Sequence, residues 1–147
     1  MQNRFQDENK RLSEFYNEVW VVCSSCQKRA VARANHEKNE ARLFCANCGY
    51  NKTHTTEANI LGINGYWDIS AHSYFEAELW LKAPFKNEVF WAYNLAHLEY
   101  LEQYISSKLR EHKDRSHFTL LEKLPKFYHE AKNREALLKL IVKLKSK

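Results

Sequence analysis

The sequence predicts an α+β protein, and three observations lead to that prediction. Two Cys-x2-Cys pairs, at residues 23–26 and 45–48, enclose a segment in which small and basic residues alternate as they do in a β-strand. A second alternating segment covers residues 74–83. From residue 95 onward, apolar residues recur at helical spacing instead.

The composition indicates a folded protein without export or membrane segments. The 147 residues are 44% hydrophobic and 14% aromatic, with three Gly and two Pro, which suits one compact core. The first ten residues are polar and mixed in charge, unlike a signal peptide. Because no run of about 18 apolar residues is present, we expect a cytoplasmic protein that does not bind membranes.

The first predicted element is a short amphipathic helix. Residues 4–18 carry Phe5, Leu12, Phe15 and Tyr16 among charged side chains. This helix would precede the first cysteine pair, with the β-rich stretch "WVVC" between them.

A β-hairpin is predicted between the two cysteine pairs. In residues 29–34, alanines form one face of a strand, while the other face bears Arg29 and Arg33. The polar residues 35–40 are typical of a loop, and residues 41–45 would return as a second strand.

Turn signals and one further strand follow the hairpin. Gly62 and the pair Asn64-Gly65 mark turns, and Asn-Gly is typical of a hairpin turn. Residues 74–83 alternate between apolar and polar side chains, which predicts a strand. Pro84 would end this strand.

The C-terminal part is predicted to be helical. Asn94 is a suitable N-cap for a helix whose apolar stripe is formed by Leu95, Leu98, Leu101, Ile105 and Leu109. After a polar break at residues 111–117, Leu124-Pro125 would open a last helical stretch that is interrupted near Asn133. The inward positions of that stretch are Leu137, Leu138, Ile141, Val142 and Leu144.

The two cysteine pairs, Cys23 with Cys26 and Cys45 with Cys48, have the spacing of a metal site. Eighteen residues separate the pairs, as in known four-cysteine zinc sites. Each Cys-x2-Cys turn offers two sulfurs on one tight loop, and a structural zinc ion takes four such ligands in a tetrahedron. We therefore expect one structural zinc ion with no open coordination position.

The residue that directly follows each Cys-x2-Cys pair in the sequence affects the turn that positions the two sulfurs. Gly49 follows the second pair and can adopt a positive φ without strain. Gln27 follows the first pair, so that turn must be made by a residue with a Cβ.

Other roles for the cysteines stay open at this point. Two disulfides or four free thiols would use the same residues, although a cytoplasmic protein favours thiolates. An iron–sulfur cluster would also use four cysteines. Redox catalysis by one Cys-x2-Cys pair fits less well, because a thioredoxin-like motif needs a βαβ context and a single pair.

Residues 20–54, with these two pairs, resemble a zinc ribbon of the kind found in transcription factor IIB and in many small bacterial proteins. The resemblance covers about a quarter of the chain and implies a β-hairpin with two cysteine loops around one structural zinc ion. The stretches "ELWL", "FWAYNLAHLEYL" and "LPKFYHEAKNREALLKLI" are similar to bacterial proteins that join such a ribbon to an α-helical C-terminal half. This second resemblance implies no particular activity.

Charged and aromatic residues suggest a binding surface. The net charge is +2 for residues 1–57, −4 for residues 58–104 and +7 for residues 105–147. The candidates for contacts with nucleic acid are Lys28, Arg29, Arg33, Arg42, Lys132, Lys139, Lys143 and Lys147. The candidates for stacking on bases are Tyr50, Tyr66, Trp67 and Trp80. The alternatives are a solvated helix face and a buried aromatic core.

No residue is predicted to be catalytic. The sequence contains no G-x-S-x-G, no H-E-x-x-H and no glycine-rich phosphate loop. His97 lies at helical spacing among tyrosines and is expected to be packed or capping. Glu76 and Glu78 would lie on the solvated side of a strand, and His54, six residues after Cys48, is expected to lie outside the metal ligands.

The sequence thus predicts two parts packed as one unit. Residues 1–57 would form the N-terminal helix and zinc ribbon, and residues 58–147 an α+β part with a small sheet and two or three basic helices. The predicted function is that of a non-catalytic zinc-ribbon module associated with DNA or RNA, such as a transcription accessory factor. The alternative is a protein–protein interaction factor, an adaptor, inhibitor or immunity-type protein, that uses the ribbon and its aromatic surface. No small-molecule substrate is expected.

Overall fold

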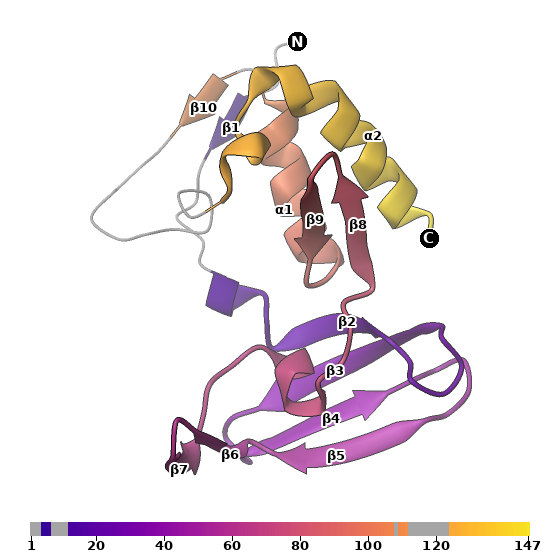
Figure 1. The fold of residues 1–147 in the computed structure, drawn as a ribbon, viewed down its shortest axis with the longest axis vertical. Coiled ribbons are helices and arrows are strands. Elements are labelled where there is room, and N and C mark those ends of the chain that lie inside the picture. The colour runs from indigo at the N-terminus through magenta and orange to yellow at the C-terminus, as the bar shows by residue number, and fades with distance from the viewer. Residues whose placement is uncertain (1–3, 7–11, 108, 112–123) are drawn as a thin grey trace. The chain divides into compact units, whose positions relative to one another are not determined.

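The computed structural model describes residues 4–6, 12–107, 109–111 and 124–147, which form a mixture of helix and sheet as predicted. The chain divides into two compact units (Figure 1). The sheet unit is Phe15–Leu81, and the helical unit is Met1–Glu14 together with Lys82–Lys147. Residues 58–81, which the sequence groups with the C-terminal part, therefore belong to the same unit as the four cysteines.

The sheet unit contains a four-stranded antiparallel sheet. The strands, in spatial order, are β2 (Glu18–Val22), β3 (Arg29–Asn35), β4 (Glu40–Phe44) and β5 (Asn51–Thr55). The register pairs Trp20 with Val31 and Val31 with Phe44, so these three residues share one face. The two strands predicted on either side of the loop at residues 35–40 are confirmed.

One face of this sheet is buried. The residues on that face are Val19, Val21, Ala30, Ala32, Ala41 and Leu43. The short 3-10 helix η2 (Ala71–Phe75) lies against all four strands and buries Ala71 and Tyr74 (Figure 1). The predicted small-residue face of β3 is confirmed, and Arg29 and Arg33 on its other face are exposed.

The predicted strand over residues 74–83 is wrong. The structure has η2 at Ala71–Phe75, and only residues 78–80 pair with the edge of β2, through the hydrogen bonds Val22 N to Glu78 O and Trp80 N to Trp20 O, both 2.9 Å. The side chains of residues 76–79 alternate between exposed and half-buried, whereas η2 buries Ala71 and Tyr74 at the three-residue spacing of a 3-10 helix. Glu76 ends η2 in the left-handed conformation, with φ 52°.

A separate two-stranded hairpin follows β5. It consists of β6 (Glu57–Ile60) and β7 (Ile63–Tyr66). Its turn is formed by Leu61 and Gly62, with φ of 54° and 81°, so the turn predicted at Asn64-Gly65 is wrong. Asn64 instead pairs with Asn59 across the strands, and Asn59 Nδ2 donates a 2.9 Å hydrogen bond to Asn64 Oδ1.

The helical unit contains two α-helices and a β-hairpin. Its elements are β1 (Arg4–Gln6), η1 (Leu12–Glu14), β8 (Leu81–Phe85), β9 (Glu88–Ala92), α1 (Leu95–Ser106), β10 (Leu109–Glu111), η3 (Lys126–Tyr128), η4 (Ala131–Asn133) and α2 (Arg134–Lys145). The helices α1 and α2 lie side by side (Figure 1). Leu98, Leu101 and Ile105 of α1 and Leu137 and Ile141 of α2 are fully buried.

Several predictions for the helical unit are confirmed. Asn94 caps α1, since its side chain accepts a 2.9 Å hydrogen bond from His97 N. His97 is packed inside the unit, with 2% of its surface exposed. The predicted interruption lies at Asn133, where η4 ends and α2 begins. Within the described residues, no helix has the length and hydrophobicity that a membrane crossing requires.

Three other predictions for this unit are wrong. Residues 4–6 form a strand, β1, that pairs in parallel with β10, so the predicted helix over residues 4–18 is not formed. Leu109 belongs to β10 and not to α1, which ends at Ser106. Pro84 lies inside β8, which is possible because a two-stranded hairpin leaves one side of each strand unpaired. Most of the predicted polar break at residues 111–117 falls outside the described residues.

Candidate metal centre

Two loops at one end of the four-stranded sheet carry the cysteines. The loop between β2 and β3 holds Cys23 and Cys26, and the loop between β4 and β5 holds Cys45 and Cys48. Antiparallel pairing of β3 with β4 brings the two loops to the same end of the sheet. The strand register therefore determines that the two cysteine pairs meet.

The four sulfur atoms form one compact cluster. All four Sγ atoms lie within 4.8 Å of one another. Cys23 Sγ is 3.7 Å from Cys48 Sγ, and Cys26 Sγ is 3.6 Å from Cys45 Sγ. A disulfide bond is far shorter, about 2.05 Å, so none of the four cysteines is joined in a disulfide. A tetrahedral zinc ion with Zn–S bonds of about 2.3 Å requires sulfurs about 3.8 Å apart, so the cluster can hold one metal ion of this size.

The two loops have matching backbone hydrogen bonds. Gln27 N donates to Cys23 O over 2.9 Å, and Gly49 N donates to Cys45 O over 2.8 Å. Gln27 has φ 66° and Gly49 has φ 82°, so both adopt the left-handed conformation. The sequence predicted that the first loop must make this turn with a Cβ-bearing residue, and Gln27 does so.

Nearby donors stabilise thiolate charge in the cluster. Asn47 Nδ2 lies 3.4 Å from Cys26 Sγ, and Ser25 N lies 3.3 Å from Cys23 Sγ. The Asn47 side chain and the backbone N–H of Lys28 lower the pKa of Cys26 to about 6. Cys26 is therefore a thiolate at neutral pH, and a bound cation would compensate the charge of the neighbouring sulfurs.

His54 does not join the cysteine cluster, as predicted. Its Nδ1 lies 2.5 Å from the carbonyl oxygen of Thr55. Its ring lies against Tyr74 and Phe75, with centroid distances of 6.5 and 6.2 Å. The candidate ligand set in the described residues is thus all-cysteine.

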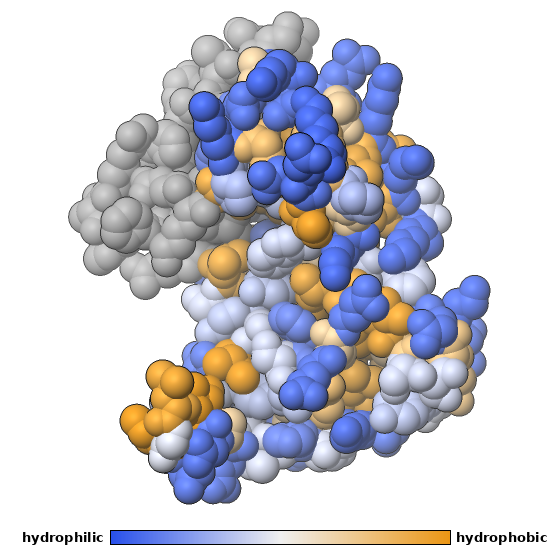
Figure 2. Space-filling view, in the orientation of Figure 1, coloured by the Kyte–Doolittle hydropathy of each residue, from blue (hydrophilic) through white to orange (hydrophobic). Residues whose placement is uncertain are grey.

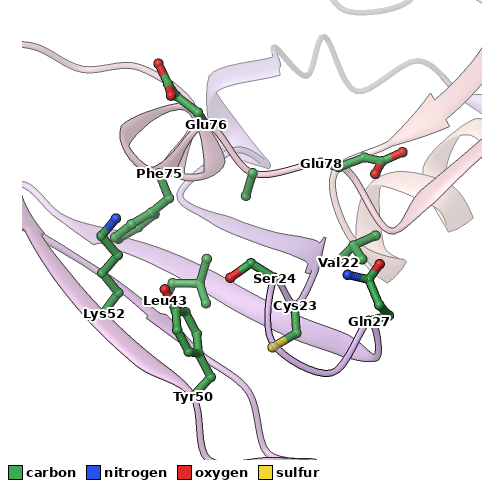
Figure 3. Close-up of a pocket in the computed structure, with 11 residues that line it drawn as sticks. Val22, Cys23, Ser24, Gln27, Leu43, Tyr50, Lys52, Phe75, Glu76 and Glu78 are labelled. Atoms are coloured by element: carbon green, nitrogen blue, oxygen red, sulfur yellow. The ribbon is translucent and has the colours of Figure 1, made fainter.

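A cavity of about 360 Å³ lies next to Cys23, between the sheet and η2 (Figure 3). Figure 3 shows Phe75, Leu43 and Tyr50 around its interior, whereas the carboxylates of Glu76 and Glu78 point outward in different directions. Glu76 and Glu78 are exposed. Because these two carboxylates do not converge, they do not form an acid–base pair in this cavity.

The open side of the sheet combines arginines with aromatic rings. The residues of this surface, called the arginine face, are Trp20, Arg29, Val31, Arg33, Arg42 and Phe44. The guanidinium carbon of Arg29 is 4.1 Å from the Trp20 ring centroid, and that of Arg42 is 5.6 Å from the Phe44 centroid. Arg33 and Arg42 are direct partners in the β3–β4 register. Three of the predicted basic residues therefore lie together on one surface.

Two of the three arginines of this face, Arg33 and Arg42, also have a polar partner. Arg33 donates from Nε and Nη2 to Glu18 Oε1, with distances of 3.1 and 2.7 Å. Arg42 Nε donates a 3.0 Å hydrogen bond to Asn51 Oδ1. These partners fix the orientation of the guanidinium groups, and Glu18 cancels part of the local positive charge.

The remaining predicted basic residues lie elsewhere. Lys28 is exposed in the first cysteine loop. The four lysines of the predicted helix stripe, all exposed, belong to the helical unit: Lys132, Lys139, Lys143 and Lys147. Two of them form surface ion pairs, Lys132 with Glu130 and Lys139 with Glu135.

Three of the four predicted stacking residues are only partly exposed, as Trp20 of the arginine face also is. Tyr50, Trp67 and Trp80 are half-buried, and the Trp67 indole donates a 2.8 Å hydrogen bond to Ala58 O. Only Tyr66 among the predicted four is well exposed, at 63%. The sequence reasoning missed Trp20 and Phe44. Extending the alternation of β3 to its neighbours would have found them, because period-two spacing puts both on the side opposite the buried residues.

Comparison with known protein families, with curated proteins and with solved structures finds no match to this chain.

Proposed function

We propose that this chain is a non-catalytic, zinc-dependent binding module whose arginine face binds single-stranded nucleic acid. One observation carries the proposal: Trp20, Val31 and Phe44 form a row across three strands, and arginines lie over both aromatic rings. Proteins that bind single strands combine positive groups with aromatic side chains in this manner.

The sulfur geometry supports zinc as the ion. Two sulfur pairs across the loops, at 3.6 and 3.7 Å, match the edge of a tetrahedral zinc–thiolate site, and all four sulfurs lie within 4.8 Å of one another. The resemblance to zinc ribbons favours the same ion. Because the protein would supply all four ligands, the zinc would hold the two loops together and leave no position for water or substrate. Its role would be structural.

Stacking favours a single strand over a duplex. The arginine face is one side of a four-stranded sheet, and its two rings, Trp20 and Phe44, lie in one row on the strands that flank β3. Bases that are not paired can stack on Trp20, Phe44 or the planar guanidinium groups above them. Paired bases in a duplex present only their edges.

Net charge does not drive this binding. The sheet unit carries six Lys and Arg residues against seven Asp and Glu residues. Binding would therefore depend on the three arginines and on stacking. With about 0.7 counterions released per phosphate contact on a single strand, three arginines correspond to a salt slope of about −2 in a plot of log K against log salt.

The test measures the affinity of the zinc-loaded protein for oligo-dT, oligo-rU and a duplex of equal length at several salt concentrations. We expect tighter binding to the single strands, with the slope given above. Arg42→Gln should weaken binding and make the slope less steep by about 0.7. Phe44→Ala should weaken binding by about 1–3 kcal/mol per lost stack and leave the slope unchanged.

Two further variants act as controls on this surface. Lys52→Gln removes a positive charge from the opposite side of the same sheet, where Lys52 pairs with Leu43, and should have no effect. Glu18→Gln should strengthen binding, because it releases Arg33 from its 2.7 Å ion pair. Equal losses for Lys52→Gln and Arg42→Gln, or no salt-dependent binding to any strand, would contradict the proposal.

A protein-binding function is the second candidate. It is favoured by the slight excess of acidic residues in the sheet unit and by exposed aliphatic residues on the β6–β7 hairpin. Aromatic residues and arginine are also enriched in protein interfaces. Under this alternative, Arg42→Gln, Phe44→Ala and Glu18→Gln would leave nucleic-acid affinity unchanged.

A further inference from the structure

We infer that the end of the β6–β7 hairpin is a docking site for a partner protein that offers an apolar pocket. The hairpin tip consists of Ile60, Leu61 and Ile63. Leu61 is 97% exposed and Ile63 is 61% exposed. Figure 2 shows the hydrophobic cluster over this hairpin. Ile60 and Ile63 are direct cross-strand partners, so both lie on one side of the hairpin, next to the turn.

The backbone conformation at the tip indicates that the stability of the fold does not explain why a leucine occupies position 61. Leu61 and Gly62 both have positive φ, at 54° and 81°, which is the conformation of a type I′ turn. Asn-Gly is strongly preferred in this turn, and a leucine at the first position is strained. Leu61 also exposes nearly its whole side chain to water. This side chain therefore contributes no hydrophobic burial to the stability of the fold. Strained residues with exposed functional side chains are typical of binding sites.

The hairpin presents these side chains rigidly. Asn59 Nδ2 donates to Asn64 Oδ1 over 2.9 Å, and Asn59 Oδ1 accepts from Gly62 N over 3.1 Å. At the base, the Trp67 indole donates to Ala58 O over 2.8 Å. An element that is already ordered loses little entropy when it binds. The tip is therefore suited to insertion into a preformed pocket.

The charge of the hairpin indicates the class of partner. Residues 58–67 contain no charged side chain, and the residues on either side are Glu57 and Asp68. Phosphate groups of nucleic acids and anionic lipids require Lys or Arg nearby, and this segment has none. Asp68 already contacts Tyr16 and His36 within this chain. A protein pocket with an apolar floor and a basic residue at its rim fits both the aliphatic tip and the exposed carboxylate of Glu57.

The size of the patch argues against a second copy of this chain as the occupant. A stable interface buries about 800 Å² on each partner. Three large side chains contribute at most about 250 Å² each, and Ile60 is already half-buried. The tip is better explained as the central anchor of an interface in which the partner supplies a pocket. This inference does not rest on nucleic-acid binding, since the hairpin lies outside the arginine face.

The test uses the zinc-loaded full chain and its Leu61→Asn variant, both immobilised and exposed to nuclease-treated lysate of cells that express the chain. Asn suits the left-handed turn, so the variant should melt at the same temperature or higher. We expect one protein to be retained by the native chain and to be recovered at least about tenfold less with Leu61→Asn, as loss of a buried leucine implies. Titration with that purified protein should show the same fold-change in Kd.

Two matched variants separate this site from others. Val142→Gln removes another exposed aliphatic side chain, 60% exposed on α2, and should leave retention unchanged. Arg42→Gln, on the arginine face, should also leave it unchanged. The inference is wrong if no protein depends on Leu61, or if Val142→Gln has an equal effect. It is also wrong if Leu61→Asn changes the sedimentation of the protein alone, or its binding to oligo-dT or to phosphatidylcholine vesicles.

Discussion

At the residue scale, Gln27 and Gly49 occupy equivalent positions behind the two cysteine pairs. Each donates its N–H to the carbonyl of the first cysteine of its pair and has positive φ. Apart from its two neighbours in the chain, none of the described residues has an atom within 4 Å of the place where a Cβ on Gly49 would be. A side chain at this position therefore does not clash, but the positive φ is energetically unfavourable for any residue with a Cβ. Gln27 has this unfavourable backbone conformation in the first loop.

We predict opposite effects for substitutions at these two positions. Gln27→Gly should raise the free energy of unfolding of the zinc-loaded protein by about 0.5–1 kcal/mol, because relief of strain exceeds the entropy cost of glycine. Gly49→Ala should lower it by about 1–2 kcal/mol. Urea denaturation measures both. If Gln27→Gly destabilised the protein as much as Gly49→Ala, the loops would not be equivalent.

At this scale the sequence predicts the four-cysteine cluster but only part of the arginine face. The cysteine spacing predicted the cluster because a Cys-x2-Cys turn is a local feature. The partners of the arginines, such as Glu18 for Arg33, depend on strand register. Register links residues distant in sequence, so a list of basic residues could not show which of them lie together.

At the scale of elements, α1 holds His97 in an apolar environment. His97 Nδ1 lies 3.0 Å from Tyr93 N, and the ring contacts Trp91 and Tyr93. Burial lowers the pKa of His97 to about 4 from an ordinary value of 6.5. The imidazole is therefore neutral in the folded protein at pH 7, and its Nδ1 lone pair accepts the hydrogen bond from Tyr93 N.

This lowered pKa predicts a loss of stability in acid. The unfolded chain takes up a proton on His97 near pH 6.5, and the folded protein only near pH 4. His97 thus contributes stability above pH 6.5 that is lost as the pH falls towards 4, by roughly 3 kcal/mol in total. His97→Gln should reduce the dependence of unfolding free energy on pH in this range. An NMR titration that places the folded-state midpoint near 6.5 would disprove the prediction.

Some of the elements predicted from a single local pattern are present in the structure, and others are not. The helix after Asn94 and the strand at residues 29–34 formed because periodicity, capping and burial agree there. The alternation in residues 74–83 does not correspond to a continuous strand, since η2 buries side chains three residues apart and only residues 78–80 pair with β2. Asn64-Gly65 has the composition of a turn, but the turn of the hairpin is formed by Leu61 and Gly62.

At the scale of the whole molecule, the two compact units could not be predicted from the chain order. The N-terminal strand β1 pairs in parallel with β10, more than 100 residues later, so the first residues belong with the C-terminal helices. Composition shifts suggested a division after residue 57, whereas the sheet unit continues to Leu81. The β6–β7 hairpin and η2 complete the sheet unit, since η2 covers the buried face of the sheet.

The central claim is that one zinc ion on four thiolates stabilises the sheet unit. Without the ion, four sulfurs within 4.8 Å would lose the charge compensation and the cross-link between the two loops. The most direct measurement determines the metal content of the purified chain by mass spectrometry, then follows circular dichroism and thermal melting during complete chelation. We predict one zinc per chain, lost together with the β-sheet signal and restored by added zinc. An unchanged spectrum and melting curve after complete metal removal would contradict the account.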